Sequence, residues 1–440
     1  MKTITRGPSI NTHISLLLIA GWIALLIGGS LVLTPSEGTR SHDTSVNSVA
    51  LAEESNVAET TAVKADPAPA TNTNSPLAEW TFIVYLDADD NTLEEAALAD
   101  FLEMASVGSN GKLNIVVQLD RTPAYDSSYG DWTDCRRFLI TKGATPADGN
   151  EVMDIGEVNM GNPATLVNFA EWAISNYPAE KYALILSGHG KGWRGLCWDQ
   201  TSGDDNINMK ELKSALTEIT KANGRPLDLL GFDACLMGMT EVAYEVHDYA
   251  AVMVASEHAE PSSGWPYDII FTNVIANPDM NAAQLGNTIV GSYYELHKEI
   301  GYTMAAIDLT RIDTVVKGLN DLSLAMLSSA DNISTSIKTI AKELTAAIDE
   351  AVINEKHGSK WAGSHGLAIY FPATSAEFDS AYNTPQIALV NDTGWDEFLI
   401  GYYTYADSPL IAGARAEAQQ YYCKDYIDLY SICQNLVAAQ

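Results

Sequence analysis

Short apolar runs alternate with amphipathic segments from residue 79 onward. The apolar runs are rich in β-branched and aromatic residues and have the length of strands: 81–86 (TFIVYL), 114–120 (NIVVQLD), 182–187 (YALILS), 227–232 (LDLLGF) and 251–256 (AVMVAS). The segments between them have helical periodicity, for example 165–178 and 208–224. Continuous apolar strands separated by helices are typical of a mostly parallel sheet covered on both faces, so the pattern predicts an α/β fold.

Two departures from strict alternation refine this prediction. Residues 136–142 (RRFLITK) follow the second strand closely and predict an antiparallel hairpin strand. A further strand is expected at residues 366–372 (GLAIYFP), with a helical tail after it. We therefore divide the folded part into a main α/β domain at 79–330 and a C-terminal region at 331–440, whose strand 366–372 completes the fold.

The N-terminal residues have a different character. Lys2 and Arg6 precede a run of about 20 apolar residues at 14–33, which is the length of a membrane-spanning helix. We therefore assign residues 1–40 to a signal or anchor segment that directs the rest of the chain out of the cytoplasm, either anchored or secreted. Residues 41–78, rich in Ser, Thr, Asn, Ala and Pro, predict a disordered tether.

Composition narrows the possible partners. The 440-residue chain carries 25 basic and 57 acidic residues, a formal charge of -32 that opposes binding to nucleic acid and favours cationic partners. Five cysteines leave at least one thiol unpaired within the chain. We expect a monomer.

The candidate chemistry lies where strands end. His189 follows the strand at 182–187 and is flanked by glycines, and Cys235 follows the strand at 227–232. Ligands of such sheets bind at the carboxyl ends of strands, so the two side chains are expected to meet in one cleft. Cys235 is also expected to open a helix, where backbone N–H groups and the helix dipole favour its thiolate.

Asp233 lies two residues before Cys235 and would point the same way if the strand continues. A carboxylate beside a nucleophilic sulfur opposes thiolate formation unless a cation lies between them, and a substrate Arg or Lys is such a cation. The alternative is that Asp233 caps the helix that follows.

Six motifs together resemble the clostripain-like cysteine peptidases of the caspase and gingipain fold group. They are VYLDADDN, NIVVQLDR, LSGHGKGWRG, LLGFDACLMG, VASEHAEPSSGWPY and GLAIYFP, in this order between residues 79 and about 403. The resemblance implies a caspase-like three-layer sandwich and an endopeptidase that acts on peptide or protein substrates with basic residues.

The resemblance also implies roles for individual residues. Cys235 matches the nucleophile and His189 its acid and base, while the N–H groups of Gly190 and Cys235 match the oxyanion hole. Asp233 matches the residue that selects Arg or Lys before the scissile bond. Glu260 and Trp265, in the motif at 260–267, match a loop that lines the substrate cleft.

Two other classes of function remain open at this point. One is a catalytically silent cell-surface binding protein with the same fold. The other is a metal-dependent hydrolase with His247 and His258 among its ligands, for which no HExxH spacing is present.

The family uses no metal or organic cofactor in its chemistry, so we expect no catalytic metal. Calcium matters to some members, and the acidic segments 87–91 and 203–206 are candidate cation loops or simply solvated turns. The tail at 414–440 resembles a helical segment that relatives carry before the strand at 366–372, so its arrangement is left open.

Overall fold

The computed structural model describes residues 77–123, 125–298, 301–328, 334–404 and 425–439. The predicted membrane segment at 14–33 and nearly all of the predicted tether therefore lie outside the described residues. None of the described helices combines the length and hydropathy needed to cross a bilayer.

A nine-stranded mixed sheet forms the centre of the fold, in the order β11-β10-β9-β8-β5-β1-β2-β3-β4. Strands β9, β8, β5, β1 and β2 are parallel, and antiparallel strands extend both edges. The strands are β1 (Ala78–Ala88), β2 (Leu113–Arg121), β3 (Cys135–Leu139), β4 (Met153–Gly156), β5 (Ala179–Ser187), β8 (Leu227–Asp233), β9 (Ala250–Ala255), β10 (Thr303–Asp308) and β11 (Val352–His357).

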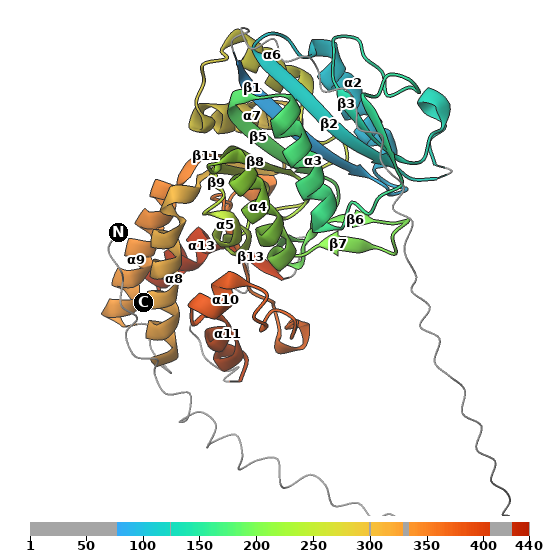
Figure 1. Cartoon of the computed structure of the whole chain (residues 1–440). Coiled ribbons are helices and arrows are strands. Elements are labelled where there is room, and N and C mark those ends of the chain that lie inside the picture. The colour runs from blue at the N-terminus through green and yellow to red at the C-terminus, as the bar shows by residue number, and fades with distance from the viewer. Residues whose placement is uncertain (1–76, 124, 299–300, 329–333, 405–424, 440) are drawn as a thin grey trace, which may run out of the picture. The chain divides into compact units, whose positions relative to one another are not determined.

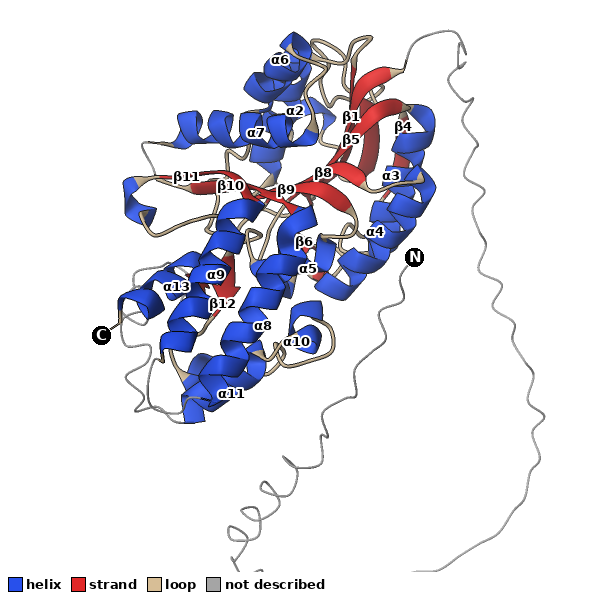
Figure 2. Ribbon diagram, turned by 90° about the vertical axis from the view of Figure 1, so that its left-hand side faces the viewer, coloured by secondary structure: helices blue, strands red, loops and turns tan. Residues whose placement is uncertain are grey.

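Helices cover both faces of this sheet (Figure 1, Figure 2). One face carries α2 (Glu94–Val107), α6 (Tyr267–Ala276) and α7 (Ala282–His297). The other carries α3 (Pro163–Asn176), α4 (Met209–Asn223) and α5 (Thr240–Val246), together with α8 (Ile312–Ser328) and α9 (Thr335–Ala351). The three-layer α/β architecture predicted from the apolar strands is confirmed.

Strand β1 shows why both faces need cover. Its alternate residues Phe82 and Val84 pack in the core on the α2 side, whereas Ile83 and Tyr85 pack on the α3 side, and all four are buried. A strand with two buried faces reads as a continuous apolar run, which is the pattern of residues 81–86.

The predicted boundary at residue 330 does not separate two parts of the structure. Strand β11 belongs to the edge of the large sheet, so that sheet draws on both predicted regions. The strand expected at 366–372 is the shorter β12 (Ala368–Tyr370), which pairs with β13 (Tyr426–Asp428) in a separate two-stranded sheet.

The remaining elements complete this lower part of the fold (Figure 1). They are α10 (Ala388–Asp392), α11 (Trp395–Thr404), α13 (Leu429–Ala438) and the hairpin of β6 (Leu196–Asp199) with β7 (Asp205–Ile207). Helix α13 packs against α9, which places the described part of the predicted helical tail. Residues 414–424 of that tail lie outside the described residues.

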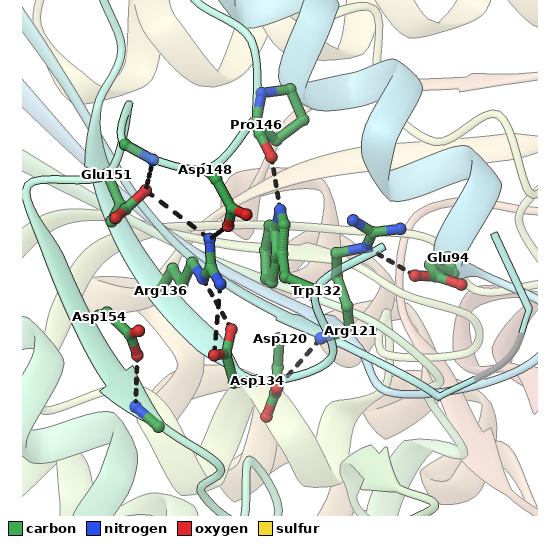
Figure 3. Close-up of polar contacts among 12 residues, drawn as sticks. Glu94, Asp120, Arg121, Trp132, Asp134, Arg136, Pro146, Asp148, Glu151 and Asp154 are labelled. Carbon is green, nitrogen blue, oxygen red and sulfur yellow. Dashed lines mark hydrogen bonds and ion pairs between the residues drawn. The ribbon is translucent and has the colours of Figure 1, made fainter. Parts of the chain in front are cut away.

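A buried ion pair fixes the start of α2, close to the site described below. The Arg121 guanidinium donates to Glu94 at 2.6 Å, and neither side chain is exposed. Figure 3 shows the Trp132 indole between the guanidinium groups of Arg121 and Arg136, which lie 4.8 and 4.4 Å from its ring centre. Because α2 is anchored in this way, the turn just before it has a fixed position.

Candidate active site

His189 lies immediately beyond the carboxyl end of β5. Its Nε2 atom is 3.2 Å from Asp90 Oδ1 and 3.2 Å from Thr92 Oγ1, both in the turn before α2. These contacts fix the ring through Nε2, so Nδ1 is the nitrogen left to exchange a proton with a neighbour. The sequence pattern did not single out Asp90 or Thr92 for this position.

Cys235 lies in a turn and not at the start of a helix. Helix α5 begins only at Thr240, so the prediction that a helix dipole supports the thiolate is wrong, and Asp233 does not cap a helix either. Instead, the Glu260 backbone N–H donates to Cys235 Sγ at 3.3 Å. Leu236 follows with φ of 67°, a left-handed conformation that an ordinary side chain adopts at some cost.

Cys235 is also the most accessible of the described cysteines. Cys135, Cys197 and Cys433 are buried, whereas Cys235 is half-buried. Burial raises the pKa of all three buried thiols, that of Cys433 to about 12. A thiol reagent is therefore expected to react first at Cys235 among these four.

The two candidate residues face one cavity, as predicted. Strands β5 and β8 are adjacent and parallel, with Ser187 opposite Asp233, so both chains leave the sheet at the same edge. His189 and Cys235 both line the cavity at this edge.

Gly190 packs against the backbone of Cys235. A Cβ atom there would overlap the Cys235 carbonyl oxygen and lie 3.1 Å from the Cys235 nitrogen, so only glycine fits. Gly190 forms an antiparallel β-bridge with Leu196. Its two hydrogen bonds are donated by the N–H groups of Lys191 and Cys197, at 3.0 and 2.9 Å, so the Gly190 N–H takes no part in them.

The wall of the cavity next to Cys235 is acidic, with carboxylates from Asp233, Asp100 and Glu260. Asp233 Oδ2 accepts from the Tyr267 hydroxyl at 2.8 Å and from the Trp265 N–H at 3.3 Å. Burial nevertheless raises the pKa of Asp233 to about 6.

The other two carboxyls are also perturbed. Burial, followed by the charge of Asp233, raises the pKa of Asp100 and of Glu260 well above the usual range. Both oxygens of Glu260 are buried, and the Tyr293 hydroxyl and the Trp265 indole N–H lie close to this carboxyl. No ion pair among the described residues involves Asp233, Asp100 or Glu260, so these three carboxyls in one cavity wall form a site for a positive group.

Gly264 allows the loop to pass over this wall. Its φ is 54°, and a Cβ atom would lie 3.0 Å from Asp233 and 3.2 Å from Asp100. Trp265 was predicted to line the cavity, but its side chain is buried behind Gly231. It contributes only its backbone N–H, which donates to Asp233. Asp100 takes its place as a lining residue that sequence reasoning missed.

His247 and His258, the ligands of the metal-hydrolase hypothesis, make contacts with different residues and do not share a common partner among the described contacts. His258 stacks on Trp361 with ring centres 3.9 Å apart, and burial lowers its pKa to about 3. His247 lies 3.4 Å from Asp313. In the described part of the chain, the group of side chains able to hold a metal contains neither histidine and consists of Asp89, Glu157 and Asp199.

Comparison with known proteins assigns the chain to a family. The model of the clostripain family matches residues 84–438. The chain belongs to the clostripain family. It is 31% identical over 318 residues to clostripain of Hathewaya histolytica, an alignment that covers 63% of this chain and 59% of that protein. The chain thus spans less than two thirds of the length of this relative.

Two solved structures share the clostripain-family fold. One is a secreted C11 cysteine protease from Bacteroides thetaiotaomicron in complex with an irreversible peptide inhibitor, at TM-score 0.57 and 18% identity, covering 72% of this chain and 99% of that one. The other is an inactive zymogen C11 protease from Parabacteroides distasonis, at TM-score 0.52 and 18% identity, covering 74% of this chain and 98% of that one.

Proposed function

We propose that this chain is an exported cysteine endopeptidase that cleaves polypeptides after Arg or Lys. Cys235 is the nucleophile and His189 the acid and base. The observation that carries the proposal is the cavity that holds both side chains next to the three carboxyls of Asp233, Asp100 and Glu260. Membership of the clostripain family supports the same reaction class.

The proposed reaction follows from these positions. The Cys235 sulfur, as the thiolate, attacks the peptide carbonyl carbon, and the N–H groups of Gly190 and Cys235 stabilise the oxyanion. His189 then gives its proton to the leaving amine as the C–N bond breaks, which leaves a thioester. Water, deprotonated by His189, attacks the thioester and releases the acid and the Cys235 sulfur.

Asp90 acts as a positioning residue in this scheme. Its carboxylate at 3.2 Å from Nε2 holds the ring and stabilises the imidazolium that precedes protonation of the amine. Hydrogen bonds from Thr92 lower the pKa of Asp90 against the opposing effect of burial, so the carboxylate stays ionised at neutral pH.

The acidic wall explains the proposed specificity. A substrate guanidinium or ammonium that enters the cavity loses water, and this is costly unless a carboxylate replaces the lost contacts. Asp233, already held by two donors, is the best-placed partner, and the buried carboxyl of Glu260 lies in the same wall. A neutral side chain would leave the same carboxyls unpaired.

Turnover of short fluorogenic peptides tests the proposal. We expect cleavage after Arg and Lys by the wild-type chain, none by Cys235→Ala, and a loss of several orders of magnitude in His189→Ala. Asp90→Asn should lower kcat about tenfold with little change in KM, since it touches the histidine and not the substrate. Peptide binding without turnover by the wild-type chain would favour the silent binding protein instead.

Export and anchoring form a separate part of the proposal. It rests on the apolar run at 14–33 after Lys2 and Arg6, and the related Bacteroides thetaiotaomicron protease is described as secreted. Cells that express the whole chain should hold it in a membrane fraction that resists salt washing, and removal of residues 1–40 should leave it in the cytoplasm. Recovery of the whole chain in the soluble cytoplasmic fraction would refute export.

A further inference from the structure

The loop after Cys235 is held by two neighbouring segments. The N–H groups of Leu236 and Gly238 donate to carbonyls of the segment 256–258, at 3.1 and 2.7 Å. The Gly238 carbonyl accepts from the N–H of Ala368, the first residue of β12, at 2.8 Å. The position of the Cys235 sulfur therefore depends on the segment 256–258 and on β12.

Two buried carboxyls join this arrangement to β13. Glu257 is the middle residue of the segment 256–258, and Asp428 is the last residue of β13, where it pairs with Ala368. Each residue is only 2% exposed. Their side chains hydrogen-bond to one another, and a bond between two carboxyls requires that one of them carries a proton.

The other hydrogen bonds of the two carboxyls come from backbone N–H groups, which carry no net charge. The Gly366 N–H donates to Glu257. Asp428 accepts from the His365 N–H at 2.9 Å and from the Ser431 N–H at 2.7 Å, and the second of these bonds caps α13. These bonds fix the two side chains in place, but they do not neutralise two charges.

The titratable groups around the pair come from β11, the loop before β12 and α13: Glu355, His357, His365 and Cys433. Burial, followed by the charge of Asp428, raises the pKa of Glu257 well above the usual range, and Glu355 acts in the same direction. His357 pairs with Glu355 at 2.8 Å. His365 Nδ1 lies 3.5 Å from Asp428, which raises the pKa of that histidine.

The opposite end of β13 contacts the loop after His189. The Tyr426 hydroxyl donates to the Lys191 carbonyl at 3.1 Å and accepts from the Arg194 guanidinium at 2.8 Å. Arg194 also pairs with Asp379 at 3.2 Å. One short strand therefore contacts the loop of the proposed acid and base at one end and the support of the nucleophile loop at the other.

We propose that a proton shared between Glu257 and Asp428 fastens β13 to the rest of the fold, and that β13 in turn positions His189 and Cys235 for turnover. The effect on turnover rests on the proposed peptidase function. The effect on stability does not, because it follows from the two buried carboxyls alone. In this role Glu257, Asp428 and Tyr426 are positioning residues, since none of them lines the cavity.

The shared proton makes the attachment of β13 sensitive to pH. Loss of this proton would leave two buried negative charges in contact, which is costly. Since folding raises the pKa of Glu257, the stabilisation is complete below the ordinary pKa of a glutamate and is lost as the pH rises through the folded value. The raised pKa of His365 has the same sign, because its positive charge beside Asp428 is also lost as the pH rises.

Urea unfolding of the whole chain carrying Cys235→Ala tests the pair without turnover or self-digestion. The amide of Glu257→Gln can donate to Asp428 at every pH, while its oxygen still accepts from the Gly366 N–H. We expect the urea midpoint of this variant, relative to the parent, to rise between about pH 5 and about pH 9. Glu171→Gln, at an exposed position of α3, is the matched control and should follow the parent.

Asp428→Asn provides a second variant of the same pair. It loses part of the α13 cap and is expected to be less stable than the parent at low pH, but its midpoint relative to the parent should rise with pH in the same way. A relative midpoint that is independent of pH in both variants would overturn the shared proton. It would do so even if the parent chain with Cys235 intact cleaves peptides.

Turnover by chains with Cys235 intact distinguishes positioning from stability alone. The ratio of kcat in Glu257→Gln to kcat in the parent should rise severalfold between about pH 7 and about pH 9, with little change in KM for an Arg peptide. The titration of His189 and Cys235 is common to both proteins and cancels in this ratio. Tyr426→Phe should lower kcat severalfold at every pH, because it removes both hydrogen bonds to the loop after His189.

Two results would overturn the positioning role. One is a kcat ratio that stays constant while the relative urea midpoint rises, and the other is an unchanged kcat in Tyr426→Phe. Absence of any cleavage by the parent would instead contradict the proposed function, and the unfolding experiment would still decide whether Glu257 and Asp428 share a proton.

Discussion

Substitution of Asp233 by Asn tests the proposed specificity most directly. Asn keeps an oxygen that can accept from the Tyr267 hydroxyl and the Trp265 N–H, so the wall keeps its shape while it loses one charge. The parent carboxylate is almost fully buried, so water screens it little. The change therefore removes a desolvated partner of the substrate cation.

The expected magnitude follows from this burial. Loss of one partner of a buried, hydrogen-bonded charge pair costs about 2–5 kcal/mol. Because Asp100 and Glu260 remain in the wall, we expect the lower part of this range, about 2–3 kcal/mol. This corresponds to a loss of roughly 30- to 150-fold in kcat/KM for an Arg peptide.

The assay compares peptides with Arg and with citrulline, its uncharged analogue, before the scissile bond. The ratio of the two kcat/KM values cancels the titration of His189 and Cys235, which both substrates share. The raised pKa of Asp233, about 6, means that its charge is present above pH 6 and lost as the pH falls below it. The preference for Arg should therefore fall below about pH 6 in the parent and be small at all pH values in Asp233→Asn.

Asp313→Asn is the control for net charge, since Asp313 is an exposed residue of α8 far along the chain from the wall. It should leave the ratio unchanged. An Arg to citrulline ratio in Asp233→Asn equal to that of the parent would refute the assignment of Asp233.

Three further outcomes are expected. Gly190→Ala should abolish turnover while the chain remains folded by circular dichroism, because its Cβ displaces the Cys235 carbonyl; normal kcat would contradict the oxyanion role. Arg121→Met should lower the free energy of unfolding in urea by about 3–5 kcal/mol, and adding Glu94→Leu should restore much of it; an unchanged single variant would show the pair to be dispensable. Mass analysis should find no cleavage within residues 195–208, because this loop contains no basic residue. Two fragments that result from a cut in this loop, found in the wild-type chain and not in Cys235→Ala, would contradict the prediction that the enzyme is active as an uncut chain.

The apolar pattern was sufficient to predict the central sheet and the positions of His189 and Cys235 at one edge of it. Strands buried on both faces give continuous apolar runs, and adjacent parallel strands end at the same edge, so His189 and Cys235 meet for reasons visible in sequence. The expectation that Cys235 opens a helix was wrong, because the chain turns after Asp233 and α5 begins only at Thr240. Periodicity does not distinguish a buried turn from the first turn of a helix.

Site residues that are distant in sequence from His189 and Cys235 were harder to predict. Asp90 and Asp100 lie far before the strand ends they face in the sequence, near residues 189 and 233, and their positions depend on where α2 starts and which way it turns. Trp265 was expected in the cleft because its motif is there, but Gly231 opens a space beneath the sheet that its ring fills. Side-chain direction within a loop is set by such packing and not by spacing in the sequence.

The pairing of β12 with β13 has a consequence for biosynthesis. The Arg194 guanidinium donates to the Tyr426 hydroxyl at 2.8 Å, and that hydroxyl donates to the Lys191 carbonyl at 3.1 Å. The segment just after His189 is thus held by residues made more than 230 positions later. A nascent chain that emerges from its amino end completes the large sheet first, with both strands that lead to His189 and Cys235. The loop after His189 gains this support only after residue 426 has been synthesised.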